Sequence, residues 1–340
     1  MHLPARLMKR YSGIGLITAL ILTSGCDDPQ PAPQPEPVQQ QPTPVSVPIT
    51  AESLAALETF RRRSTELLDG LVVCTETLET LGEQFLQQTD TTNLEAVQAQ
   101  WQACFDLYRA STLLRGFTQT HRQALQAARN NLGQPLVMPG FIDRVSGYPY
   151  SGIVNDASLL LDESNLRQQH GLTDETEVSI GFSVVAFLLW GEQRQQPELP
   201  ARPVTDYEPA TLWDDGFTDL PIEAHPNNRR RHLLELALRL LTKDSQALRN
   251  LWQSGEFPSS ETAAEAWRRQ QIQAMLTALE QQPDNTQVST HLAAWLADGA
   301  IPGLPPATDA PSADQPAPLR QQLSRALESG AGQRVPTEPG

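Results

Sequence analysis

The sequence predicts an all-α protein. Two observations lead to this prediction: apolar residues recur three and four positions apart through several long segments, and an uncharged apolar run over 179–191 has the length and composition of a helix buried on nearly all sides. With 340 residues and 39% hydrophobic residues, the chain can form one large or two ordinary globular domains. Its formal net charge of −15, without a basic stripe interleaved with aromatics, argues against nucleic acid as a partner.

The first 26 residues have the pattern of an export signal. Three basic residues precede an uncharged apolar stretch over 14–23, and Ser24-Gly25-Cys26 follows it. This end is similar to a bacterial lipoprotein cleavage box, in which the cysteine is acylated and becomes the mature N-terminus. An ordinary secretory signal with an incidental Cys26 is the alternative. Asp27 is similar to the inner-membrane retention signal of some Gram-negative lipoproteins, which favours the inner membrane.

Residues 27–48 are rich in proline and glutamine and carry almost no large apolar side chains. Such a segment cannot bury a core, so we expect an extended, partly polyproline tether before the folded body. The multiple acyl chains of a bacterial lipoprotein would hold the chain firmly to a membrane. We therefore expect a lipid-anchored protein on the periplasmic side of the bacterial envelope. Its expected partners are the membrane and a periplasmic or membrane protein.

Thr50 is the expected N-cap of a long first helix. A polar turn over 87–91 follows it, and Thr92 with Glu95 forms the capping box of a second helix that extends to Ser111. The two helices are therefore expected to pack antiparallel. The seam of the first helix, with alternating spacings of three and four, consists of Leu57, Phe60, Ser64, Leu67, Leu71, Cys74, Leu78, Leu81 and Phe85.

Cys74 and Cys104 lie on the seams of these two helices, equally far from Thr89 in the middle of the turn. At about 1.5 Å rise per residue they sit at the same height, so a disulfide bond is geometrically natural. An oxidising compartment favours this bond, which would contribute about 3 kcal/mol. Two reduced cysteines in the core are the alternative. Metal binding is disfavoured because neither has a Cys or His neighbour at ligand spacing.

Further helices follow, separated by irregular segments. The segments 139–150 and 195–228 keep no period, and prolines exclude long helices from the second. A proline-rich stretch over 301–318 precedes a short helix at 319–327 and a polar tail expected to be disordered. Besides the apolar run, helices are expected at 118–131, 159–166, 229–252, 260–279 and 286–296.

Six segments occur in a characteristic order and spacing: Trp101–Phe117, Phe141–Val145, Gly152–Asp156, Gly181–Gly191, Arg202–Tyr207 and Arg229–Leu234. Taken together, they resemble the imelysin family of bacterial periplasmic and surface proteins. That family includes insulin-cleaving membrane protease, iron-regulated protein A and the periplasmic component of a ferrous-iron uptake system. The resemblance implies two helical bundles, an N-terminal one over 49–171 and a C-terminal one over 172–300, followed by the linker, short helix and tail of 301–340.

The family's hallmark is a G-x-H-x-x-E motif, whose histidine and glutamate lie three residues apart on one helix face, within reach of one metal or ligand. In this sequence the glycine of the motif is present as Gly181, but Ser183 occupies the histidine position and Ala186 occupies the glutamate position. A serine hydroxyl is a poor ligand for a transition metal and alanine is none. The metallopeptidase chemistry proposed for the family therefore loses both groups that it requires.

We therefore expect no catalytic residue, no metal site and no cofactor, with iron or another divalent metal disfavoured. Ser183 is better interpreted as a buried helix serine than as a nucleophile, because Val185 replaces the second glycine of a nucleophile elbow. The resemblance places Ser183 and Ala186 near the junction of the two bundles.

Four acidic residues are candidates for ligand binding: Asp143, Asp156, Glu192 and Asp206. Glu192 follows the apolar run and is able to replace a lost carboxylate, although a solvated helix-end glutamate is the simpler interpretation. Asp206 belongs to an acidic loop that offers oxygens to a hard cation but lacks the regular spacing of a calcium loop.

These observations favour a non-catalytic envelope lipoprotein that keeps the family scaffold and uses the surviving cleft for a ligand or partner. The resemblance links it to iron uptake. Two alternatives stay open: an imelysin-type metallopeptidase that uses other groups, and a structural envelope adaptor.

Overall fold

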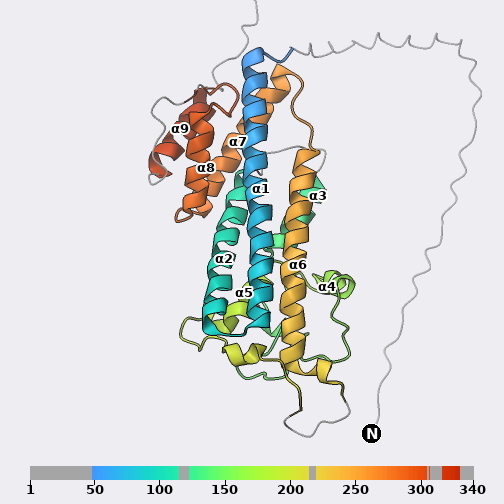
Figure 1. Cartoon of the computed structure of the whole chain (residues 1–340). Coiled ribbons are helices and arrows are strands. Elements are labelled where there is room, and N and C mark those ends of the chain that lie inside the picture. The colour runs from blue at the N-terminus through green and yellow to red at the C-terminus, as the bar shows by residue number, and fades with distance from the viewer. Residues whose placement is uncertain (1–47, 115–121, 214–219, 305, 307–315, 330–340) are drawn as a thin grey trace, which may run out of the picture. The chain divides into compact units, whose positions relative to one another are not determined.

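The computed structural model describes residues 48–114, 122–213, 220–304, 306 and 316–329, all within the compact unit Ser46–Gly340. Helices make up its regular structure (Figure 1). Within these ranges there is no β-strand, only two isolated bridges that pair Pro48 with Ser260 and Val145 with Tyr148. The predicted all-α class is confirmed.

Helices α1 to α9 follow one another along the described ranges, with five short 3₁₀ helices between them. The α-helices are α1 Ala51–Gln87, α2 Thr91–Ala110, α3 Arg122–Gly133, α4 Glu163–Gln169, α5 Phe182–Trp190, α6 Pro226–Gln253, α7 Glu261–Gln281, α8 Thr286–Ala297 and α9 Pro316–Ser329. The 3₁₀ helices are η1 Ser111–Leu114, η2 Pro139–Phe141, η3 Gly191–Arg194, η4 Val204–Tyr207 and η5 Ile222–Ala224.

Helix α1 has a long neighbour on each side. Thr50 caps its first turn as predicted, because the Thr50 hydroxyl accepts a hydrogen bond from the Ser53 N–H at 3.2 Å. The seam of α1 packs against α2 and α6, and Figure 1 shows these three helices side by side. Apolar burial of this kind stabilises a fold by about 25 cal/mol for each Å² removed from water.

Aromatic side chains join the C-terminal helices to α1. The Phe60 ring of α1 meets Trp267 of α7 and Trp295 of α8 edge to face, with ring centroids 4.8 and 5.3 Å apart. Trp252 of α6 lies 6.2 Å from the same ring. One aromatic cluster therefore fixes α6, α7 and α8 on α1, and α9 packs on α7 and α8.

The expected division into two bundles at residue 171 is not confirmed. Helix α6, expected in the second bundle, packs along α1 and α3 of the first. The buried apolar residues form one cluster that runs from Leu57 of α1 to Ala326 of α9. Domain boundaries between residues 49 and 300 therefore stay a prediction.

Two helix starts differ from the sequence predictions. Asp90, and not Thr92, caps α2: the Asp90 carboxylate accepts a hydrogen bond from the Asn93 N–H at 2.8 Å. The capping box was the wrong choice because the aspartate already caps the helix two residues earlier. Pro226 opens α6 inside the segment expected to be irregular, since proline lacks only an N–H that the first helical turn leaves unpaired.

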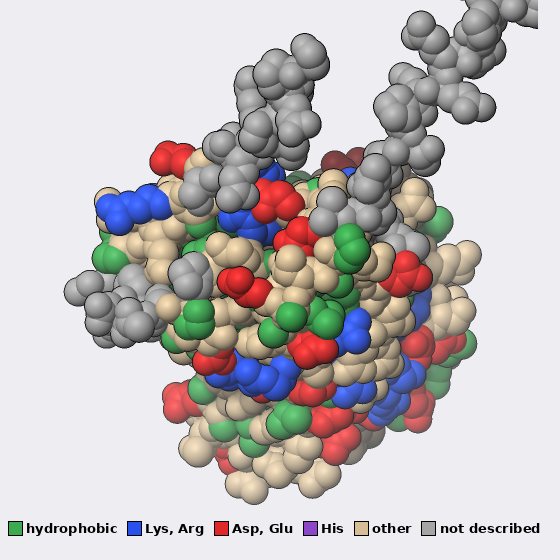
Figure 2. Space-filling model, turned by 90° about the horizontal axis from the view of Figure 1, so that it is seen from above, with side chains coloured by type: hydrophobic (Ala, Val, Ile, Leu, Met, Phe, Trp, Pro, Cys, Tyr) green, Lys and Arg blue, Asp and Glu red, His purple; other side chains and the backbone are tan. Residues whose placement is uncertain are grey.

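The export signal, Cys26 and Asp27 lie outside the described residues, as do most of the tether and the tail over 330–340. No helix among the described residues is long and apolar enough to cross a membrane. On the face that Figure 2 shows, acidic and basic side chains are interspersed and hydrophobic side chains are scattered. Such a mixed surface is typical of a solvent-exposed face.

Candidate functional site

Helix α5 carries the motif positions and is bounded by two glycines. Gly181 caps its N-terminus with φ +94°, and a Cβ added there would lie 2.5 Å from the carbonyl oxygen of Asn131. Only glycine combines this backbone conformation with this approach. Gly191 ends the helix at φ +64°. The helix is therefore shorter than the apolar run over 179–191, and most of it is buried as predicted.

Ser183 and Ala186, three residues apart on α5, line one pocket of about 310 Å³. Its walls come from α2, α5, η3 and the segment that follows α3. The Ser183 hydroxyl donates a hydrogen bond to the carbonyl oxygen of Gln134, so its proton is already engaged. The other lining residues are mostly apolar: Trp101, Phe105, Gly133, Pro135, Leu136, Phe187, Gly191, Arg194 and Gln195.

Arg194 is the only charged residue among the described residues that line this pocket. Its guanidinium group lies 4.1 Å from the ring centroid of Trp101 and 4.7 Å from that of Trp190. It donates a hydrogen bond to Oε1 of Gln102 at 3.2 Å, and no described carboxylate forms a salt bridge with it. The pocket thus combines aromatic walls with one cation at its edge.

A charged cluster lies beside α5 and consists of Asp143, Arg144, Arg202, Asp206 and Arg230. Asp143 is fully buried, and its Oδ2 accepts hydrogen bonds from Arg230 at 2.6 Å and Arg202 at 2.8 Å. Arg202 also reaches Asp206 at 3.2 Å. Arg144 donates to both carboxylate oxygens of Asp206, at 2.7 and 2.8 Å. Each buried charge in this charged cluster is therefore paired with an opposite charge.

The arginine partners of Asp143 stabilise its charged form. Burial favours the neutral form of Asp143, but the guanidinium groups of Arg202 and Arg230 outweigh it and lower the pKa of that carboxyl. Burial raises the pKa of Tyr207, whose hydroxyl donates to the carbonyl oxygen of Leu188 in α5. These hydrogen bonds hold the neighbouring helix α5 in place.

A second cavity, of about 560 Å³, is lined by Arg144, Glu192 and Asp206 among others. Glu192 accepts a hydrogen bond from the Ser146 N–H at 2.8 Å. The structure thus brings Glu192 and Asp206 to one cavity. Asp143 does not line this cavity but shares a hydrogen-bond partner, Arg202, with Asp206. Asp156 is separate from them.

Asp156 lies in an exposed turn, where its Oδ1 accepts hydrogen bonds from the N–H and the hydroxyl of Ser158 at 3.0 and 2.6 Å. It lines neither cavity. This geometry is that of a turn-stabilising aspartate, because both hydrogen bonds are made within three residues of chain. Its role as a ligand-binding residue stays a prediction without a site around it.

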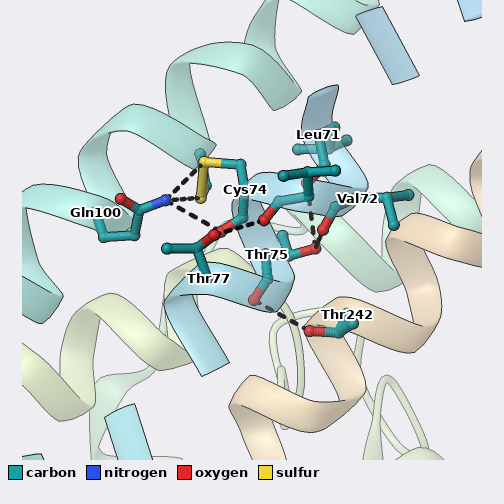
Figure 3. Close-up of a disulfide and its surroundings, with 9 residues drawn as sticks. Leu71, Val72, Cys74, Thr75, Thr77, Gln100 and Thr242 are labelled. Carbon is teal, nitrogen blue, oxygen red and sulfur yellow. Dashed lines mark hydrogen bonds between the residues drawn. A yellow bond between two sulfur atoms is a disulfide. The ribbon is translucent and has the colours of Figure 1, made fainter. Parts of the chain in front are cut away.

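Cys74 of α1 and Cys104 of α2 form the predicted disulfide bond, with their Cα atoms 5.4 Å apart. The Gln100 amide lies beside the two sulfur atoms and donates a hydrogen bond to the carbonyl oxygen of Cys74 at 3.1 Å (Figure 3). The bond ties α2, which supplies Trp101 and Phe105 to the pocket, to α1. It supports the pocket and does not line it.

The residues at the motif positions do not fit a metal ion. Ser183 uses its hydroxyl proton on a backbone carbonyl, Ala186 has no donor atom, and the nearby Arg194 would repel a cation. Within the described ranges, no group of three or more His, Cys, Asp and Glu residues is arranged to hold a metal.

The family model for Imelysin, Peptidase_M75, matches residues 68–294, which is more than half of the chain. The chain belongs to the imelysin family. No curated protein matches the sequence. The imelysin match includes α5, both cysteines of the disulfide bond, and every residue that lines the pocket.

Sequence reasoning missed the residues that give this imelysin pocket its chemistry. Trp101 and Phe105 both lie in a segment that carries the family resemblance, and the sequence alone does not indicate that they line a pocket, as both do. Arg194 was not singled out. One signal was available: Arg194 is the first basic residue after the apolar run that carries the family motif, within one turn of its end. Arg202 and Arg230, the partners of Asp143, lie 59 and 87 residues away in the sequence, and the only signal for them is that all three residues fall in segments that carry the family resemblance.

Proposed function

We propose that this imelysin-family chain is a lipid-anchored envelope protein that binds a small organic ligand in the α5 pocket and does not cleave peptides. The observation that carries the proposal is the chemistry of that pocket. At the positions of the family's metal-binding histidine and glutamate, the pocket has an engaged hydroxyl and a methyl group, within mainly apolar walls and beside one arginine.

The size and lining of the pocket support ligand binding. Ligand pockets have volumes of about 300–1,000 Å³, are mainly apolar and carry a few polar groups that orient the ligand. A pocket of about 310 Å³ with Trp101, Phe105 and Phe187 in its walls fits the lower end of that class. The ligand is therefore a small molecule, and a folded partner protein does not enter.

The same lining argues against hydrolysis. Peptide hydrolysis needs an activated water or a nucleophile with a general base within hydrogen-bond reach. None of the described residues that line the pocket is a histidine, aspartate or glutamate. Ser183 has only a carbonyl oxygen as its hydrogen-bond partner, which cannot accept its proton as a base.

The location of the protein is part of the proposal and rests on the N-terminal sequence. Acylation of Cys26 would anchor the chain, and the Pro/Gln-rich residues that follow would hold the folded unit away from the membrane surface. The link to iron uptake rests on the family resemblance. In that setting, the protein would take up an organic ligand or contact a membrane partner at the periplasmic side of the envelope.

Binding of a neutral aromatic probe tests the ligand-binding proposal. Isothermal titration calorimetry of 2-naphthalenemethanol into the purified chain is expected to show one site. Ala186→Leu fills the pocket and should abolish this binding, whereas Ala55→Leu on the exposed face of α1 should leave it unchanged. Absence of binding, or binding that survives Ala186→Leu with an intact fold, would overturn the proposal.

Activity and location have separate tests. Incubation of the purified chain with unfolded casein is expected to leave the casein intact with or without added Zn²⁺; cleavage that a chelator abolishes would contradict the non-catalytic assignment. Metabolic labelling of the expressing cell with a radioactive fatty acid is expected to label the wild-type chain and not Cys26→Ala. A wild-type chain without label, or equal labelling of the variant, would contradict the lipid anchor at Cys26.

A further inference from the structure

We infer that the α5 pocket selects an organic anion, namely a small aromatic carboxylate whose ring fills the pocket and whose carboxylate pairs with Arg194. This inference rests on the proposed function and adds the chemical class of the ligand. Two independent features carry it: the hydrogen-bonding state of Arg194 and the aromatic lining of the pocket.

Arg194 differs from the buried arginines Arg202, Arg229 and Arg230. Arg202 and Arg230 each pair with a buried carboxylate at 2.6–2.8 Å. Arg229 donates three hydrogen bonds to backbone carbonyl oxygens at 2.8–2.9 Å. Arg194 has one neutral amide oxygen, that of Gln102 at 3.2 Å, although a guanidinium group carries five N–H donors. Its hydrogen-bonding capacity is thus largely free for a ligand.

Asp106, whose charge acts on Arg194, forms no hydrogen bond or ion pair with it. Both Asp106 oxygens accept hydrogen bonds from the Gln102 amide at 3.2 Å, and one lies 4.0 Å from Arg109. The Gln102 amide therefore bridges the two residues: its NH₂ group donates to Asp106, and its oxygen accepts from Arg194. The positive charge at the edge of the pocket remains, and an anion is the ligand group that matches it.

Two tryptophan rings hold the guanidinium group at the edge of the pocket. The ring centroids of Trp101 and Trp190 lie 4.1 and 4.7 Å from its carbon atom, which is the range of a cation–π contact, and the two rings are inclined at 72° to each other. Neither ring supplies a carboxylate, so the N–H groups of the guanidinium remain available to pair bidentately with one from a ligand. Arg194 is thus ordered before the ligand arrives, which lowers the entropy cost of binding.

The walls favour a ring over a flexible chain. Trp101, Phe105 and Phe187 line the pocket, and aromatic rings gain from offset or edge-to-face contact with such side chains. The polar groups of the lining already have partners: Ser183 donates to Gln134, and Gln195 donates its amide to the carbonyl oxygen of Leu136 at 3.0 Å. Arg194 is therefore the one lining residue left to recognise a charged group.

Three probes that share one ring system and differ in charge test the inference. Calorimetry compares 2-naphthoate, 2-naphthalenemethanol and 2-naphthylmethylammonium on the purified chain. We expect 2-naphthoate to bind at least about tenfold more tightly than the alcohol, and the ammonium probe to bind most weakly. Arg194→Gln should weaken 2-naphthoate about ten- to hundredfold, with little change for the alcohol. Arg194→Lys should recover part of the loss, because it keeps the charge but not the bidentate geometry.

Arg239→Gln is the matched control, since Arg239 is a similarly exposed arginine on α6 that does not line the pocket. It should leave all three affinities unchanged. Equal affinities for the three probes, all abolished by Ala186→Leu, would overturn the inference and leave the proposed ligand pocket intact. Absence of binding by every probe would overturn both. Selectivity for 2-naphthoate that persists in Arg194→Gln would also contradict the inference.

Discussion

The charged cluster around Asp143 and the pocket around Arg194 both border helix α5, and their arginines differ in how they are paired. In the charged cluster, Arg202 and Arg230 are buried and each is paired with the carboxylate of Asp143. In the pocket, Arg194 is exposed, lies within cation–π distance of two tryptophan rings and has no hydrogen-bonded carboxylate among the described residues. The contrast teaches that a satisfied arginine fixes the fold, whereas an ordered but unsatisfied arginine is available to a ligand.

The two regions should differ most in how strongly the removal of one charged side chain lowers the stability of the fold. In the charged cluster, removal leaves buried guanidinium groups without their partner. At the pocket, removal leaves only solvated groups and two aromatic rings. We therefore expect the largest effects on stability at the charged cluster and the smallest at the pocket.

Asp143→Ala is expected to reduce the free energy of unfolding by about 3–5 kcal/mol, because Arg202 and Arg230 lose their shared buried carboxylate. Urea unfolding followed by circular dichroism measures the change. Asp156→Ala is the control, since Asp156 is exposed and caps only a local turn; we expect a loss below about 1 kcal/mol. Equal losses in the two variants would show that the charged cluster does not support the fold.

Part of the loss of stability at low pH should come from the protonation of Asp143. The pKa of this carboxyl is lowered in the folded protein, so its contribution is fully present above the unfolded pKa of about 3.9 and is lost as the pH falls through the folded pKa. The difference in unfolding free energy between the wild type and Asp143→Asn is therefore expected to stay constant from pH 7 to 5 and to shrink below about pH 4. Urea titrations at a series of pH values measure it. A difference that shrinks already between pH 7 and 5 would contradict the lowered pKa.

Arg194→Gln should change stability least. It removes a cation stacked on two rings at an exposed position, and we expect a loss of at most about 1 kcal/mol. The same urea experiment measures this variant beside Asp143→Ala. If Arg194→Gln destabilised the fold as strongly as Asp143→Ala, Arg194 would belong with the structural arginines and the contrast between the two regions would fail.

Sequence reasoning succeeded where the signal is local. The seam of α1, its cap at Thr50 and the pairing of Cys74 with Cys104 all follow from spacing along two adjacent helices joined by a short turn. It failed at the start of α2, where Asp90 and Thr92 both carry capping side chains and spacing alone does not decide between them.

The candidate site was only partly accessible to the same reasoning. The motif helix and its substituted positions Ser183 and Ala186 are visible in the sequence, and the structure places both in one pocket. The character of that pocket depends on Trp101 and Arg194, which come from different segments and meet only in the fold. Likewise, nothing in the sequence near Asp143 indicates that its partners are distant arginines.

Calorimetric titration of Zn²⁺ and Fe²⁺ into the purified chain tests most directly whether the α5 pocket lacks the family's metal site. We expect no one-to-one metal binding by the wild type and a gain of metal affinity in the double variant Ser183→His/Ala186→Glu, which restores the family's side chains on the same helix face. Tight one-to-one metal binding by the wild-type chain that Ser183→Ala abolishes would contradict this expectation.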